Sequence, residues 1–238
     1  MNTNEIFAIW LPLLVAGLVQ ASFSLGVSML TLLSGHLLSQ EKSAKRLSSL
    51  SATYIFGSLT AVVGMLISAI YILSQLHFTS DTKFWSILAG SSVGVGLAVL
   101  LFYYRWDSGR GSSGTRLWLP RRAAEYLYQR TKATKRNFEA FILGIGSIVA
   151  ELIFIVAPIF IAANLIAELT GIRQNTAIIV YVFIAILPLI ILFFSNRRGV
   201  KISTFQKWRE KNKKFLQILA GILLIVLGFY LFIFKAML

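Results

Sequence analysis

Six long apolar stretches dominate this chain and leave few folds open to it. They cover residues 7–38, 50–76, 84–104, 138–167, 177–194 and 215–234. A helix needs about 20 predominantly apolar residues to cross the hydrocarbon core of a bilayer. The composition agrees, because 57% of the 238 residues are hydrophobic and the mean hydropathy is +0.76. The sequence therefore predicts an all-α polytopic membrane protein with six transmembrane helices.

The placement of the basic residues predicts how such a protein is oriented. Of the 23 Lys and Arg residues, three lie in 42–46, nine in 105–136 and eight in 197–214. These segments are the first, third and fifth connections between spans, so they fall on one side of the membrane. Basic connections usually face the cytoplasm. We therefore expect a multi-pass plasma-membrane protein with both termini extracytoplasmic. Its basic loops would contact anionic lipid headgroups rather than nucleic acid, despite the net charge of +14.

The two halves of the chain resemble each other at an offset of 127 residues over their first two apolar stretches and of 131 residues over the third, where ILAG occurs at 87–90 and at 218–221. A stripe of small and polar residues in the first apolar stretch has counterparts in the fourth. The first copy is Gly17, Gln20, Ser24, Ser28, Thr31 and Gly35, and the second is Gly144, Ser147, Glu151, Ile155, Pro158 and Ala162. Spacings of 3 and 4 residues place each set on one face of a helix. An odd number of spans in each copy would insert the second copy upside down, as in many inverted-repeat transporters.

The repeat predicts the domain organisation and where helices bend. We expect a first three-helix repeat at 1–106, a basic cytoplasmic linker with a short interfacial helix at 107–137, and a second three-helix repeat at 138–238. Spans one and four are longer than a bilayer requires, so they must tilt, kink or break. The expected hinges, where glycine or proline loosens the helix, are Gly17, Gly144, Gly146 and Pro158.

Glu151 is the acidic residue at the middle of a predicted span. A charged carboxylate at that depth costs about 2.5–3.5 kcal/mol or more, so it is expected to face the bundle interior or water. In one interpretation Glu151 faces the substrate or couples its movement to a proton. In the other it is a protonated, structural carboxyl that is hydrogen-bonded to serine or to a backbone carbonyl.

Other polar residues of the predicted spans offer hydrogen bonds to a solute. They are Gln20, Ser22, Ser24, Ser28 and Thr31 in the first span and Ser147 and Asn164 in the fourth. The alternative role is helix packing, because small residues let helices approach and hydroxyls bond across their interfaces. The matched residues Tyr54 and Tyr181 are expected to hydrogen-bond across the interface between the halves. No His, Asp and Glu cluster has metal-ligand spacing, so we expect no metal, no cofactor and no enzymatic activity.

Three segments resemble the lysine-exporter (LysE) superfamily, which includes CcdA/DsbD-like membrane proteins. Residues 20–25 (QASFSL) lie where those exporters have a Pro-Gly-Pro-type break. Residues 51–64 (SATYIFGSLTAVVG) are similar to their small-residue second span, and 215–232 (FLQILAGILLIVLGFYLF) to their Gly-punctuated third span. The chain lacks the paired prolines, the cysteines of the thiol carriers, and the intramembrane Asp and His residues of the metal exporters. The resemblance then implies export of a small organic solute or an amphiphile.

Together these features predict a secondary active transporter, an exporter that is proton-coupled through Glu151. The alternative is a non-transport membrane scaffold or accessory subunit, in which the stripes pack helices and the basic loops dock a partner or anionic lipid. An intramembrane enzyme acting on lipid is a third interpretation, for which one carboxylate without a metal or nucleophile is a thin basis. The glycine-rich spans also permit a homodimer.

Overall fold

The computed structural model describes residues 9–22, 30, 33, 44–75, 82–106, 129–131, 134, 136–197 and 202–233 of the chain. This part of the chain is helical almost throughout and contains no strand. Its helices are α2 (Leu11–Ser22), α4 (Ala44–Gln75), α5 (Thr82–Trp106), α7 (Asn137–Ala150), α8 (Leu152–Ala167), α9 (Ile172–Arg197) and α10 (Ile202–Leu231). Apolar segments form helices in a bilayer because a helix satisfies its own backbone hydrogen bonds.

Four of the described helices, α4, α5, α9 and α10, are long and apolar enough to cross a membrane. Helices α7 and α8 pass the same test together, although they meet at a bend of 82°. The described residues therefore contain four to five candidate spans, which is the make-up of a helical membrane protein. Of the predicted span at 7–38, the structure describes Ile9, Trp10, the short apolar helix α2, Leu30 and Leu33. Most of the predicted linker at 107–137 lies outside the described residues.

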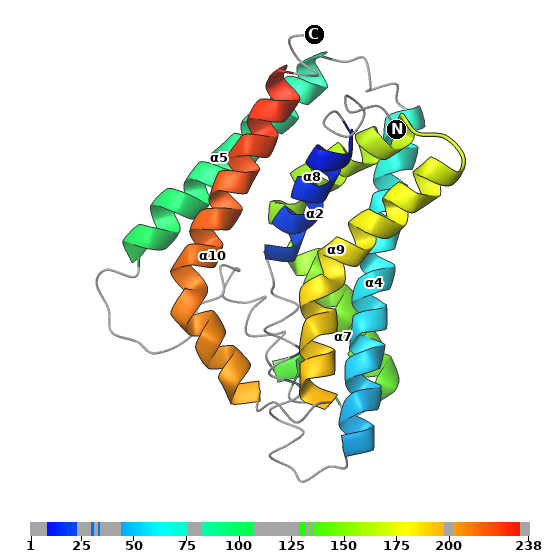
Figure 1. Cartoon of the computed structure of the whole chain (residues 1–238), viewed down its shortest axis with the longest axis vertical. Coiled ribbons are helices and arrows are strands. Elements are labelled where there is room, and N and C mark those ends of the chain that lie inside the picture. Colours follow the sequence, from blue (N-terminus) through cyan, green and yellow to red (C-terminus); the bar gives the residue numbers. More distant parts are fainter. Residues whose placement is uncertain are drawn as a thin grey trace.

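The bent pair α7–α8 connects opposite ends of the helix bundle. The start of α7 packs with Leu189 and Leu192 near the end of α9, and with Leu50 near the start of α4. Helix α8 ends at Ala167, only a few residues before α9 begins at Ile172. Since α9 has 26 residues, its two ends lie about 39 Å apart. The pair α7–α8 thus runs from one end of the bundle toward the other, with a bend of 82° between its two helices. Helices α4, α7 and α10 begin at one end of the bundle, and α9 ends there (Figure 1). We call this end the basic end.

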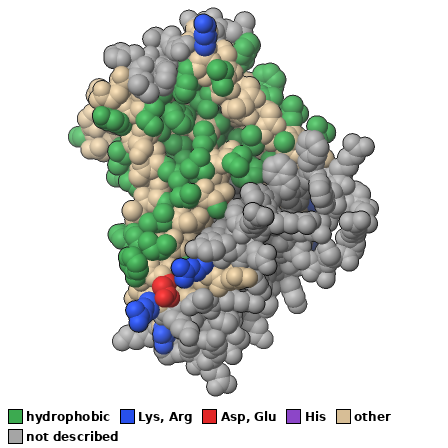
Figure 2. Space-filling view, turned by 180° about the vertical axis from the view of Figure 1, so that it is seen from behind, with side chains coloured by type: hydrophobic (Ala, Val, Ile, Leu, Met, Phe, Trp, Pro, Cys, Tyr) green, Lys and Arg blue, Asp and Glu red, His purple; other side chains and the backbone are tan. Residues whose placement is uncertain are grey.

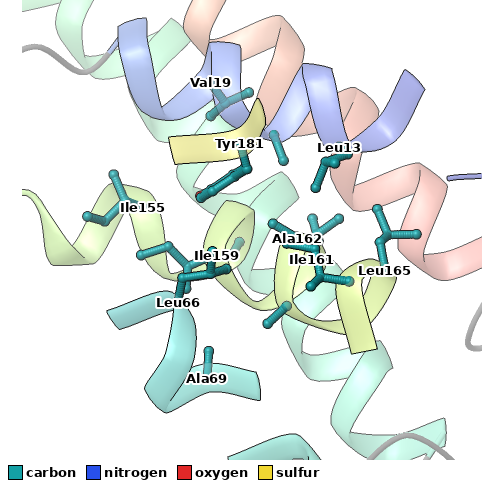
Figure 3. Close-up of a cluster of buried hydrophobic side chains, with 14 of the residues drawn as sticks. Leu13, Val19, Leu66, Ala69, Ile155, Ile159, Ile161, Ala162, Leu165 and Tyr181 are labelled. Carbon is teal, nitrogen blue, oxygen red and sulfur yellow. The ribbon is translucent and has the colours of Figure 1, made fainter. Parts of the chain in front are cut away.

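Helices α2 and α8 lie at the centre of the arrangement (Figure 1). On one side α5 packs along α10, and on the other α4 packs along α7 and α2 along α9. Helix α8 lies between α2 and α4, and its residue Ile159 lies beside Leu66 of α4 (Figure 3). Ile155, Ile159 and Leu165 belong to one buried cluster with side chains of both neighbours. The central helix α8 is the most completely buried apolar element, with ten of its 16 residues buried.

The outer surface is apolar where a bilayer would cover it. Large side chains such as Ile87, Ile153 and Ile179 are 72%, 67% and 67% exposed. On the face seen in Figure 2, the described charged side chains lie toward the two ends, and the band between them is largely hydrophobic. Apolar patches this extensive mark contact with lipid or with another protein.

Glycines allow α4 and α7 to cross in close contact. A Cβ atom added at Gly144 would lie 2.2 Å from the backbone oxygen of Tyr54, and one added at Gly57 would lie 2.1 Å from the backbone oxygen of Phe141. Both obstacles are backbone atoms, which cannot rotate away. The crossing therefore depends on glycine at both positions, as at other close helix contacts in membranes.

We expect the substitution Gly144→Ala to lower the thermal stability of the protein in detergent. The added methyl group would push α4 and α7 apart, and overpacking of this kind costs about 1–3 kcal/mol. Gly64→Ala in α4 is the matched control, because nothing lies within 4 Å of its added Cβ atom. Thermal unfolding followed by fluorescence would measure both variants. Equal stability of the two variants would show that the crossing does not depend on Gly144.

Candidate functional site

Glu151 forms the break in the bent span. Its backbone has φ −83° and ψ −2°, and its amide donates to the carbonyl oxygen of Ile148 at 3.0 Å, closing the last turn of α7. Its own carbonyl oxygen accepts hydrogen bonds from the amides of Phe154 at 2.8 Å and Ile155 at 3.2 Å, which begin α8. The Glu151 side chain is only 5% exposed. The carboxyl group therefore lies inside the protein, not against lipid, at the point where the span changes direction.

A buried hydrogen-bonded group lies next to Glu151 at the crossing of α4 and α7. The Tyr54 hydroxyl donates to Ser147 Oγ at 2.8 Å, and Ser147 Oγ donates to the carbonyl oxygen of Gly144 at 2.8 Å. Ser58 Oγ reaches the same carbonyl oxygen at 3.3 Å. Glu151 follows Ser147 by four residues, about one helical turn. We call Tyr54 and Ser147 the basic-end pair.

A second buried pair joins α9 to α2. The Tyr181 hydroxyl donates to Gln20 Oε1, and both residues are buried. The other polar atom of the amide, Gln20 Nε2, has no hydrogen-bond partner within the described part of the chain. We call Tyr181 and Gln20 the opposite-end pair.

The two pairs are the same interaction at corresponding sequence positions. An offset of 127 converts Gln20 into Ser147 and Tyr54 into Tyr181. In each pair a tyrosine from one half of the chain donates to a residue of the other half. The prediction from sequence that Tyr54 and Tyr181 hydrogen-bond across the interface between the halves is therefore confirmed.

The glycines next to these pairs follow the same correspondence. A Cβ atom at Gly17 would lie 3.0 Å from the Ile184 side chain and 3.6 Å from the backbone oxygen of Tyr181. At the corresponding position Gly144 the nearest atom is the backbone oxygen of Tyr54. Both glycines therefore allow close packing of one helix against a tyrosine-bearing helix of the other half of the chain: Gly17 in α2 against α9, and Gly144 in α7 against α4.

The pairs lie at similar depths measured from opposite ends. Tyr54 follows the exposed residue Arg46 by eight positions in α4, and Tyr181 follows the exposed residue Arg173 by eight positions in α9. Eight residues of helix correspond to about 12 Å. Helix α4 begins at the basic end and α9 at the other. Glu151, one turn beyond Ser147, therefore lies deeper than the basic-end pair.

The position of the break corrects the predicted hinges. Span four is broken as expected, but Gly144 and Gly146 lie within α7 and Pro158 lies within α8. Proline removes only one backbone donor from a helix. In a membrane span, groups on neighbouring helices can satisfy the backbone oxygen that loses its partner, so proline need not break the helix. Gly17 likewise lies inside the continuous helix α2. The span bends at Glu151, where α7 ends its packing along α4 and α8 turns to pack between α2 and α4.

The remaining predicted site residues do not gather around Glu151. Ser22 Oγ donates to the backbone oxygen of Val19 at 2.7 Å within its own helix. Asn164 is buried near the end of α8, where its Nδ2 donates to Glu168 Oε1 at 3.1 Å. It follows Glu151 by 13 residues, about 20 Å along the helix. Ser24, Ser28 and Thr31 lie outside the described residues.

Sequence reasoning missed Ser58 and Gly57, which complete the crossing at Tyr54. Their signal was present in the 3- and 4-residue spacing of small and polar residues at Ser51, Tyr54 and Ser58.

Comparison with known proteins identifies no relative. No family model matches the chain, and neither a curated protein nor a solved structure matches it.

Within the described residues, no group of three or more His, Cys, Asp or Glu side chains is arranged to hold a metal ion. The described residues offer a buried carboxyl group at a helix break, a hydroxyl pair one turn before it, and a buried amide group in the opposite-end pair.

We expect the basic-end pair to contribute measurably to stability. In a double-mutant cycle of Tyr54→Phe and Ser147→Ala, the coupling energy should be about 0.6 kcal/mol, and no more than about 1.7 kcal/mol, as for other hydrogen bonds between membrane helices. Reversible unfolding of the single and double variants in mixed micelles would measure it. The control cycle combines Tyr54→Phe with Ser86→Ala, since Ser86 bonds only within its own helix at Thr82. Coupling no larger than in that control would contradict the expectation.

Proposed function

We propose that this protein is a secondary active transporter that exports a small organic solute or amphiphile across the plasma membrane. The observation that carries the proposal is a buried carboxyl group, Glu151, at the break of a membrane-crossing helix pair. Broken helices supply substrate and ion sites in transporters because their interrupted backbone and polar side chains can face a cavity at mid-membrane. An acidic residue in a span is by default a functional candidate.

The correspondence between the two halves of the chain supports this proposal. The repeated tyrosine hydrogen bonds and the repeated glycine contacts link equivalent positions of the two halves, and α2 and α7 enter the bundle from opposite ends. We infer six spans in two inverted three-helix repeats, with the basic end facing the cytoplasm as the positive-inside pattern predicts. The two halves are interlocked, because the first-span helix of each packs on the tyrosine-bearing helix of the other.

The two tyrosine pairs suit the role of gates. Each joins a first-span helix to a helix of the other half, and the pairs lie on opposite sides of the molecule's mid-depth. Breaking the basic-end pair alone would loosen α7 from α4 and open a route from that end. Breaking the opposite-end pair alone would loosen α2 from α9. Alternating access requires gates of this kind, one on each side of a shared site.

Glu151 supplies the coupling chemistry. In a dry interior, ionisation of the carboxyl group costs about 2.5–3.5 kcal/mol or more, so the neutral form is favoured while the site is closed. Access of water or of a cationic group lowers that cost. Glu151 would therefore exchange its proton with whichever side is open, and would bind a proton from that side before the site closes. The proton would be released when the site opens to the other side, in step with solute movement.

Glu151→Gln is expected to abolish proton-linked flux while leaving the fold intact, because glutamine keeps the size and hydrogen-bonding capacity but cannot ionise. The protein would be reconstituted into vesicles containing a pH-sensitive dye and tested with amino acids, neutral amides, amines and dicarboxylates. We expect a pH change driven by at least one class of solute, reduced about tenfold or more in the variant.

Glu139→Gln is the matched control. Glu139 lies in the first turn of α7, where its carboxylate accepts a hydrogen bond from the backbone amide of Arg136 at 3.1 Å, and glutamine preserves this cap. This variant should transport normally. Undiminished coupling in Glu151→Gln would reject the role of Glu151 in transport. Wild-type vesicles that move no solute would reject transport and favour a scaffold role.

A further inference from the structure

The two tyrosine pairs differ in whether every donor of the accepting residue has a hydrogen-bond partner among the described residues. In the basic-end pair, Ser147 Oγ accepts from Tyr54 and uses its single proton on the carbonyl oxygen of Gly144. In the opposite-end pair, Gln20 accepts from Tyr181 but has a second polar atom, Nε2, that carries two protons. Only 3% of the Gln20 side chain is exposed, and Nε2 has no partner in the described part of the chain.

A buried donor without a partner is costly. Leaving such a group unsatisfied costs about 1–3 kcal/mol, and most buried polar groups in proteins are hydrogen-bonded. An apolar residue at position 20 would avoid this cost, and a serine, as at position 147, would satisfy all its protons locally. An unfilled donor at this depth is accounted for if a ligand fills it.

The chemistry of the missing partner follows from the donor and its surroundings. An amide N–H₂ group binds an acceptor, such as a carbonyl, carboxyl or hydroxyl oxygen. The buried polar side chains of the described residues include Glu151 but no Lys, Arg or His. A ligand with net negative charge would therefore enter a low-dielectric interior that holds a carboxyl group and no described buried cation, which is strongly unfavourable.

We infer that Gln20 binds an acceptor oxygen of the transported solute through Nε2, and that the solute carries no net negative charge. The inference rests on the proposed function, because water and solute must reach Gln20 through the protein. It assigns different roles to two corresponding residues. Gln20 contacts the solute, whereas Ser147 holds two helices together.

The absence of cysteine from the chain allows a direct test. Gln20→Cys would place a single thiol at the site, in protein reconstituted into vesicles. Two methanethiosulfonate reagents of similar size would be compared, one carrying a trimethylammonium group and the other a sulfonate. Thr82→Cys, at the exposed first residue of α5, supplies the reference rate for each reagent. Relative to that reference, we expect the cationic reagent to modify residue 20 at least about tenfold faster than the anionic one.

A second variant keeps the test informative if Gln20→Cys alone does not fold. Since Gln20→Cys removes the acceptor of the Tyr181 hydroxyl, the double variant Gln20→Cys/Tyr181→Phe removes the stranded donor as well. No modification of residue 20 by either reagent in a folded variant, or an equal or faster normalised rate with the anionic reagent, would overturn the inference.

The outcome is separable from that of the flux experiment. If residue 20 is modified with the expected charge preference but the wild-type protein moves no solute, transport is rejected, and what remains is a solvent-accessible position that disfavours anions. If the protein transports solute and residue 20 stays unmodified, transport stands and the inference about Gln20 is rejected.

Discussion

The structure depends on pairing the polar groups that lie at membrane depth inside the protein. The core is built from Leu, Ile, Val and Ala, and a bilayer outside it would offer no hydrogen-bond partners. Tyr54 and Tyr181 meet this constraint by donating across the bundle to Ser147 and Gln20. Because each hydrogen bond joins distant parts of the chain, satisfying these groups also fixes which helices are neighbours. The glycines beside the pairs then allow the close approach that the hydrogen bonds require.

Much of this arrangement could be predicted from sequence, because it depends on properties that single residues carry. Apolar length predicts helices, and the offset of 127 predicts that Tyr54 and Tyr181 are equivalent and bond across the halves. The location of the break could not be predicted in this way. Glycine and proline mark places where a helix loses intrinsic stability, but Gly144 and Pro158 lie inside helices held by their neighbours. The chain bends instead at Glu151, where the packing partners of α7 and α8 change, and no local residue pattern records that change.

In the candidate site, too, one residue could be predicted from the sequence and the roles of others could not. Glu151 could be identified from its charge, because burying a carboxyl group in an apolar segment is expensive whatever surrounds it. The roles of Ser22 and Asn164 could not be inferred from polarity alone. Ser22 satisfies its hydroxyl on its own helix, and Asn164 donates to Glu168 far along α8 from the break. A polar side chain in a span is informative about function only once its hydrogen-bond partners are known.

The two halves share contacts but differ in chemistry. The hydrogen bond from tyrosine and the packing of glycine recur at corresponding positions, so these features carry the geometry that both halves need. Gln20 corresponds to Ser147, and Glu151 corresponds to Ser24, so the halves differ where donors and charge are supplied. A framework that serves only to hold helices together gains nothing from such differences, because a serine satisfies the same tyrosine without an unfilled donor. Gln20 Nε2, which has no hydrogen-bond partner among the described residues, and the buried carboxyl group of Glu151 are therefore the differences between the halves at which a ligand would satisfy a polar group.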